Sequence, residues 1–85
     1  MAKYKLYSIK DTKVGFMNPF VSNNDGVAIR TFTNGANEPE KNAINTNPED
    51  KELWCLGEFD DQTGELVSNV KFMVKANDVI IKKGE

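Results

Sequence analysis

The chain has 85 residues, of which 39% are hydrophobic and 28% are charged, and its formal net charge is -2. This length fits one domain with a limited core, and the composition is too apolar for a disordered chain. Histidine is absent, and Cys55 is the only cysteine. These counts exclude an intramolecular disulfide, imidazole chemistry and a zinc site with the usual ligands. Since Cys55 lies in an apolar run, we expect it to be a small buried hydrophobe.

Charge is unevenly distributed along the chain. Residues 31–65 carry nine carboxylates against two lysines, whereas residues 1–30 and 66–85 are both net basic. Because the ends of a domain often lie close together, we expect the two basic ends to share one face, which could bind an anion. No apolar run is long enough to cross a membrane, and no secretory leader is recognisable. We therefore expect a cytosolic protein without a membrane partner.

The N-terminal part of the chain predicts two strands. Residues 3–9 are rich in aromatic and β-favouring residues, and the turn-forming stretch KDTK follows them. Residues 14–17 predict a second, short strand. Pro19 should end it, because proline donates no hydrogen bond to a ladder.

Residues 24–34 predict a helix. Ser22, three residues before Asp25, resembles a capping box with aspartate in place of glutamate. The helix propensity of this segment is poor, so the helix must depend on packing against the sheet. The residues expected to pack there are Val27, Ala28 and Phe32.

Residues 37–50 contain two prolines and four asparagines and predict a long surface loop. Residues 51–70 then predict a hairpin, with Gly64 in the turn where a positive φ is needed. Strict alternation places Leu53, Cys55, Gly57 and Phe59 on one face and Trp54, Leu56 and Glu58 on the other. Further strands, broken at ANDV, are expected in residues 70–81.

The predicted fold class is α+β. One helix covers a small, mostly antiparallel sheet of about four strands, in a single domain of residues 1–85. The acidic hairpin turn lacks the alternating oxygen ligands of a calcium loop. Phosphate loops and dinucleotide fingerprints are absent, and a domain with one helix has little volume for a catalytic pocket. We expect no enzyme activity, no metal and no cofactor.

The first predicted strand allows two interpretations. Alternation places Lys3, Lys5 and Tyr7 on one face, and this mixture of cations with an aromatic ring suits single-stranded nucleic acid. Lys13 and Phe16 on the next strand would extend that surface. The plainer alternative carries more weight on the sequence alone: Tyr7 packs under the helix, and the lysines only protect an edge strand.

Trp54 presents a similar choice. It is either a second core contact in a two-sided sheet or an exposed platform for stacking. The sequence favours the core position.

Three motifs occur in the order and spacing of a known family. They are YSIKDTKVGFMNPF, NDGVAIRTF and NPEDKELWCLGEFDDQTGEL, and they span most of residues 4–67. In these motifs the chain resembles the small nonstructural protein of gokushoviruses, which are single-stranded-DNA phages of the microvirus family. The chain has one proline near position 19, where the family often has two. From Lys71 onward the resemblance ends.

The resemblance implies a nonstructural, DNA-binding protein of the host cytoplasm that assists viral genome synthesis or packaging. It supplies no catalytic residues. Arg30 falls on the helix arginine of the family, and Tyr7, Lys13 and Phe16 fall in its first motif, which makes all four better candidates for a DNA-facing surface. The predicted nucleic-acid-binding residues are Lys3, Lys5, Tyr7, Lys13, Phe16, Arg30, Lys71 and Lys75.

Binding of single-stranded DNA through about five or six phosphate contacts should weaken steeply with salt. The alternative is a protein-interaction module in which the acidic residues 37–52 engage the phage replication initiator, a host replication factor or a capsid precursor. A homodimer would serve either role, by doubling the basic surface or by pairing edge strands.

Overall fold

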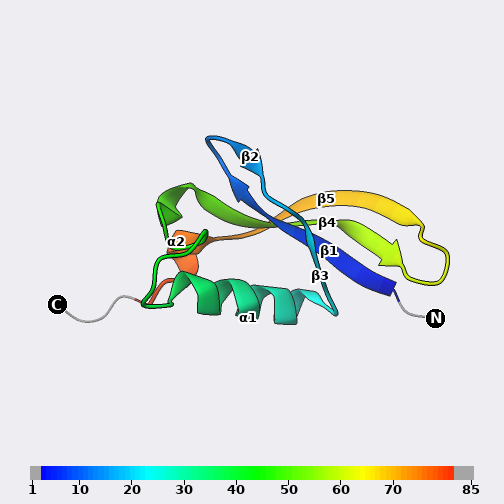
Figure 1. Ribbon diagram of the computed structural model, residues 1–85, viewed down its shortest axis with the longest axis horizontal. Coiled ribbons are helices and arrows are strands. Elements are labelled where there is room, and N and C mark those ends of the chain that lie inside the picture. The colour runs from blue at the N-terminus through cyan, green and yellow to red at the C-terminus, as the bar shows by residue number, and fades with distance from the viewer. Residues whose placement is uncertain (1–2, 82–85) are drawn as a thin grey trace.

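A twisted antiparallel sheet with one long helix along a single face makes up the fold (Figure 1). The computed structural model describes residues 3–81. The elements in chain order are β1 (Lys3–Asp11), β2 (Gly15–Phe16), β3 (Phe20–Ser22), α1 (Asp25–Ala36), the 3-10 helix η1 (Pro48–Asp50), β4 (Lys51–Asp60), β5 (Leu66–Lys75) and α2 (Ala76–Val79). The predicted α+β class with a mostly antiparallel sheet is confirmed.

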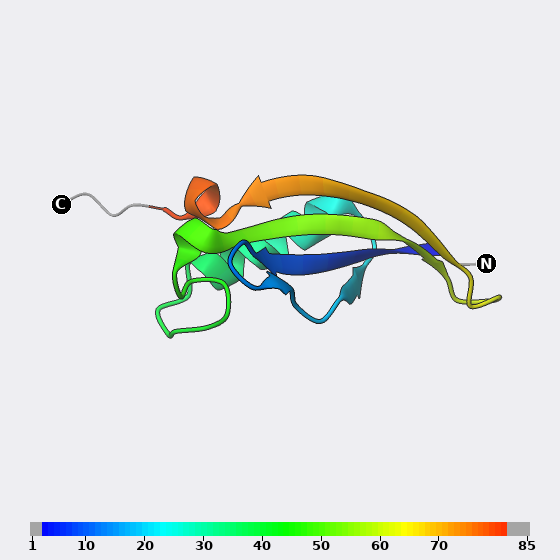
Figure 2. The same ribbon diagram turned by 90° about the horizontal axis from the view of Figure 1, so that it is seen from above.

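The sheet is built around β1 and β4, which pair along their whole lengths. β5 lies on the far side of β4, whereas the two short strands β2 and β3 share the other side of β1 (Figure 2). The sequence did not predict β3, which resumes pairing with β1 directly after Pro19. The ANDV stretch forms the short helix α2 instead of a break between strands.

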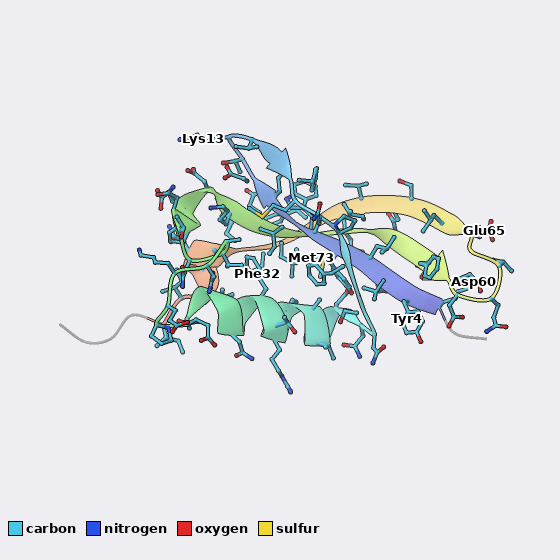
Figure 3. All side chains as sticks on the ribbon, viewed as in Figure 1. Tyr4, Lys13, Phe32, Asp60, Glu65 and Met73 are labelled. Carbon is cyan, nitrogen blue, oxygen red and sulfur yellow. The ribbon has the colours of Figure 1, made fainter. Side chains whose placement is uncertain are left out.

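The core lies between the sheet and α1. Tyr7 and Leu53 are fully buried, and they pack with Ala28 and Phe32 of the helix. Figure 3 shows Phe32 and Met73 in this space. The plainer interpretation of the first strand is therefore right for Tyr7, whose ring belongs to the core.

The start and the buried face of α1 differ from the prediction. The N-cap is Asn24, whose Oδ1 accepts a hydrogen bond from the Val27 amide at 2.9 Å, so the capping box that we expected at Ser22 is wrong. Ala28 and Phe32 are buried as predicted, but Val27 is 44% exposed. The buried positions recur every four residues, and Val27 lies one position outside that stripe.

Asparagine side chains hold the segment after α1, which the sequence presented as a loose loop. Asn42 Nδ2 donates to the Gly35 carbonyl at 2.8 Å, and Asn45 Nδ2 donates to the Glu40 carbonyl at 2.8 Å. Asn37 Nδ2 donates to the carbonyl of Val79 at 3.0 Å, and its Oδ1 accepts from the Ile81 amide at 2.7 Å. These bonds tie the end of the helix to the end of the chain that the structure describes.

Strict alternation in β4 is wrong beyond Cys55. The pairing with β1 shifts after Cys55, so that Gly57 stands opposite Leu6 and Phe59 opposite Tyr4. Residues directly opposite one another share a face in an antiparallel pair. This β-bulge therefore moves Gly57 and Phe59 off the face of Leu53 and Cys55, where we expected them.

The two basic regions of the chain meet in part, because Lys5 and Lys71 both form ion pairs with Asp25, but their outer lysines lie far apart. Lys3 pairs with the last residue of β4, and Lys75 pairs with Glu52 near the first, so these two lysines lie at opposite ends of the sheet. In a molecule that is 51 Å in its longest dimension, the two ends of the sheet lie too far apart for one patch that combines Lys3 with Lys75.

Candidate functional site

The face of the sheet that points away from α1, here called the open face, carries three aromatic rings in contact. Trp54 of β4 lies between Phe16 of β2 and Phe72 of β5. Its ring centroid is 5.7 Å from that of Phe16 and 5.8 Å from that of Phe72, both in edge-to-face orientation. The register produces this row, because Trp54 pairs directly with Phe72 and with Ser8 of β1.

A lysine completes the group. Lys10 of β1 pairs with Phe16, and its Nζ lies 4.9 Å from the centroid of Trp54 and 5.4 Å from that of Phe16. Both distances are within the range of cation–π attraction. Lys10, Phe16, Trp54 and Phe72 are called the open-face cluster below.

Hydrogen bonds fix the cluster in place. Trp54 Nε1 donates to Glu52 Oε1 at 2.8 Å, which sets the orientation of the indole ring. Fully buried Ser8 donates from Oγ to the Met17 carbonyl at 2.7 Å, and the Met17 amide donates to Ile9 at 2.8 Å. These bonds hold the short β2 segment against β1, and so position Phe16.

The cluster has accessible rings on a preformed surface. Phe16 is 47% exposed and Phe72 is 45% exposed, although both are large apolar residues. Such rings offer π faces and edges on which a nucleic-acid base can stack, and the ammonium group of Lys10 beside them can contact a phosphate.

A second group of polar residues lies on the opposite face, at the start of α1. Asp25 accepts a hydrogen bond from the Tyr7 hydroxyl, and it forms ion pairs with Lys5 at 3.5 Å and with Lys71 at 4.0 Å. Burial, followed by the Asp25 hydrogen bond, raises the pKa of Tyr7 well above its usual value. The same hydrogen bond, helped by the two lysines, lowers the pKa of Asp25. This group is an internally compensated charge cluster.

The structure divides the predicted nucleic-acid-binding residues between the two faces. Tyr7 is fully buried beneath α1, so its assignment as a surface stacking residue is wrong. Lys5 and Lys71 are occupied by Asp25 on the same covered face, whereas Phe16 lies on the open face.

The remaining predicted cations are dispersed over exposed positions. Lys13, in the turn between β1 and β2, lies 3.8 Å from Asp50. Arg30 is exposed on α1, Lys3 begins β1, and Lys75 ends β5 opposite Glu52. These residues therefore do not form one continuous surface.

The sequence did not identify Lys10 and Phe72 as residues of a candidate site, and it allowed two interpretations of Trp54. The structure places Trp54 half-buried in a ring cluster on the open face, which combines features of both. The signal for Lys10 was its place in the alternation of β1, two residues beyond Ser8. Phe72 could be placed beside Trp54 only from the register between β4 and β5. That register shifts twice, so it does not follow from counting residues back from the hairpin turn.

In the acidic hairpin turn, an aspartate side chain binds the backbone of the turn itself. Asp60 Oδ1 accepts hydrogen bonds from the amides of Gln62 at 2.9 Å and Thr63 at 3.4 Å.

Within residues 3–81, no group of three or more cysteine, aspartate or glutamate side chains is arranged to hold a metal ion. Over the same residues, no helix is long and apolar enough to cross a membrane.

Comparison with known proteins gives one family. The family described as Phage ORF5 protein matches residues 4–79, from β1 to the last residue of α2. The chain belongs to the Phage ORF5 protein family. It is therefore a phage protein, in agreement with the broader part of the resemblance seen in the motifs. No curated protein and no solved structure matches this Phage ORF5 protein.

Proposed function

We propose that this Phage ORF5 protein is a non-enzymatic, nonstructural protein that binds single-stranded DNA in the host cytoplasm and assists viral genome synthesis or packaging. The observation that carries the proposal is the open-face cluster, in which Lys10 lies over Trp54 and Phe16. The motif resemblance to the gokushovirus nonstructural protein supports the same role.

The chemistry of the cluster favours a single strand over a duplex. Unpaired bases expose their faces for stacking on aromatic side chains, and such stacking tolerates any sequence. In a duplex these faces are already stacked on one another. An open sheet face also admits a chain of nucleotides, whereas a small-molecule ligand needs a concave site.

The electrostatic contribution should be smaller than the sequence suggested. Lys5 and Lys71 lie on the covered face with Asp25, so the cations on the side of the cluster are Lys10, Lys13 and Lys75, of which Lys13 also forms an exposed ion pair with Asp50. Three phosphate contacts predict a slope of about -2 in a plot of log affinity against log salt. Since Glu52 lies between Lys10 and Lys75 in the register, we expect weak binding.

The test compares two lysines of the same strand. Lys10 and Lys5 both belong to β1, but Lys10 lies on the open face and Lys5 on the face covered by α1. In fluorescence anisotropy with a labelled single strand of thirty nucleotides, Lys10→Gln should weaken binding by about five-fold. Lys5→Gln, which removes the same charge, should change it less than about two-fold.

Equal loss of affinity in both variants would show that only net charge matters and would contradict a role for the open face. Absence of binding by the wild-type protein at low salt would reject the DNA-binding function itself.

In that second case, the protein-interaction alternative takes precedence. The exposed acids Glu38, Glu40 and Glu49 stand on a segment that asparagine hydrogen bonds hold in shape. A shaped acidic surface suits a basic protein partner, such as a replication initiator, a host replication factor or a capsid precursor.

A further inference from the structure

The two edges of the sheet differ in how they are protected. One edge is made by β2 and β3, which are two and three residues long and are separated by a segment containing Pro19. The other edge is β5, which has ten residues and, among the strands of residues 3–81, pairs with β4 alone. Within residues 3–81, no element lies along its outer side (Figure 2). A long strand of this kind presents unpaired backbone donors and acceptors to another chain.

β5 is also unusually apolar for an exposed edge. Leu66 is 65% exposed, Val67 51%, Val70 54% and Phe72 45%. Edge strands are commonly protected by charged residues. The charge in the middle of β5 is Lys71, whose Nζ lies 4.0 Å from Asp25 of the same molecule and whose side chain is still 52% exposed, so that it can also face a carboxylate on a partner strand.

We propose that β5 pairs antiparallel with β5 of a second copy of this chain, around a two-fold axis at Ser68. In this register Glu65 stands opposite Lys71 and Leu66 opposite Val70, and each pair occurs twice. Opposite charges and apolar pairs are the cross-strand combinations that stabilise a sheet. A register centred on Lys71 would place two lysines opposite each other. One centred on Val70 would place Glu65 opposite Lys75, so that the pairing would have to extend to the last residue of β5, beside α2.

The paired segment, residues 65–71, lies away from the end of β5 that α2 follows. Its side chains are all exposed, and α2 follows β5 only after Lys75. Because so few residues take part, the contact belongs to the small, transient class of interfaces. The dimer should therefore form at high protein concentration and dissociate on dilution.

Such a dimer changes the geometry of the proposed DNA site. A two-fold axis perpendicular to the sheet keeps both open faces on the same side and both α1 helices on the other. Phe72 lies on β5, so the two open-face clusters would flank the new interface and offer one longer track for a single strand. This consequence rests on the proposed function, whereas the interface does not.

The first test measures association by sedimentation. The wild-type protein should show a concentration-dependent increase in mass towards the dimer, and Glu65→Lys should weaken association by about ten-fold, because it creates two lysine–lysine pairs. Glu38→Lys is the matched control, since it makes the same charge change on the exposed segment after α1 and should leave association unchanged.

The second test fixes the register and does not depend on the stability of the charge variant. In Ser68→Cys the two cysteines meet at the two-fold axis, within the distance that a disulfide needs, so mild oxidation should give a covalent dimer. In Val70→Cys the two thiols lie four residues apart along the strands, roughly 13 Å, and should not couple. The wild-type protein should not couple either, because Cys55 is buried.

Wild-type protein that remains monomeric at several hundred micromolar would overturn the proposal. A dimer that is insensitive to Glu65→Lys and is not trapped by Ser68→Cys would also overturn it, because the copies would then meet elsewhere. The DNA-binding function fails separately: a trapped Ser68→Cys dimer that binds no single strand would retain the interface and reject the function.

Discussion

At the scale of single residues, Tyr7 shows how position in a strand and role in the protein can differ. Alternation correctly grouped Tyr7 with Lys5, but it could not tell which face the helix covers. In the structure the ring is buried, and its hydroxyl reaches the charged group of Asp25. A buried phenol needs such a partner, because an unpaired hydroxyl in the core would be costly.

The Tyr7–Asp25 hydrogen bond should contribute to stability in a pH-dependent way. It lowers the pKa of Asp25, so the unfolded chain binds a proton more readily than the folded one. The contribution is therefore present near neutral pH and is lost as the pH falls below the ordinary aspartate pKa of 3.8 and through the lower pKa of folded Asp25. Tyr7→Phe should lower the free energy of unfolding at pH 7 by about 1–2 kcal/mol and flatten its decline with acid.

Denaturant unfolding at several pH values checks this. Tyr4→Phe is the matched control, because within residues 3–81 its hydroxyl has no hydrogen-bond partner. If Tyr7→Phe showed the same acid dependence as the wild type, the hydrogen bond would not be the cause of the lowered pKa of Asp25.

At the scale of elements, Gly57 determines how β4 and β5 pair. Its φ is +149°, a conformation that side chains rarely adopt, and a Cβ there would lie 2.0 Å from the Val67 carbonyl oxygen. Simple alternation would place Trp54 and Phe59 of β4 on opposite faces of the sheet. The bulge next to Gly57 brings both side chains to the open face. The shape of the open face thus depends on a glycine that is not itself a member of the open-face cluster.

Gly57→Ala should lower the free energy of unfolding by about 3 kcal/mol or more, because β5 must move away from β4. Gly15→Ala distinguishes the cost of backbone strain from the cost of the clash with Val67. Gly15 also has a positive φ, +133°, but a Cβ there would meet nothing within 4 Å. Its cost should be smaller, about 1–2 kcal/mol. Thermal unfolding of the two variants makes the comparison, and equal losses would refute a special role for the contact with Val67.

The elements that the sequence predicted are those with a local signal. The alternation of β1, the buried stripe of α1 and the turn at Gly64 can each be recognised within about a dozen residues. The bulge beside Gly57 and the pairing of β3 depend on contacts between distant segments. For that reason the class of fold could be predicted, but the assignment of Gly57 and Phe59 to a face could not.

At the scale of the whole molecule, the two faces of the sheet differ in the side chains that they carry and in how exposed these are. The face under α1 holds the core and compensates its lysines with Asp25, whereas the open face keeps aromatic rings exposed. Phe16 was predicted correctly as a surface residue. Its partners Trp54 and Phe72 could not be joined to it without the register, because they come from strands far apart in the sequence.

The most direct test of the open-face cluster uses the fluorescence of Trp54, the only tryptophan of the chain. Titration with an unlabelled single strand should quench this fluorescence, because a base that stacks on the cluster contacts the indole ring. Added salt should reverse the quenching, with the shallow slope expected for three phosphate contacts. Anisotropy that rises on DNA binding while Trp54 fluorescence stays constant would contradict the account, because the strand would then bind elsewhere on the molecule.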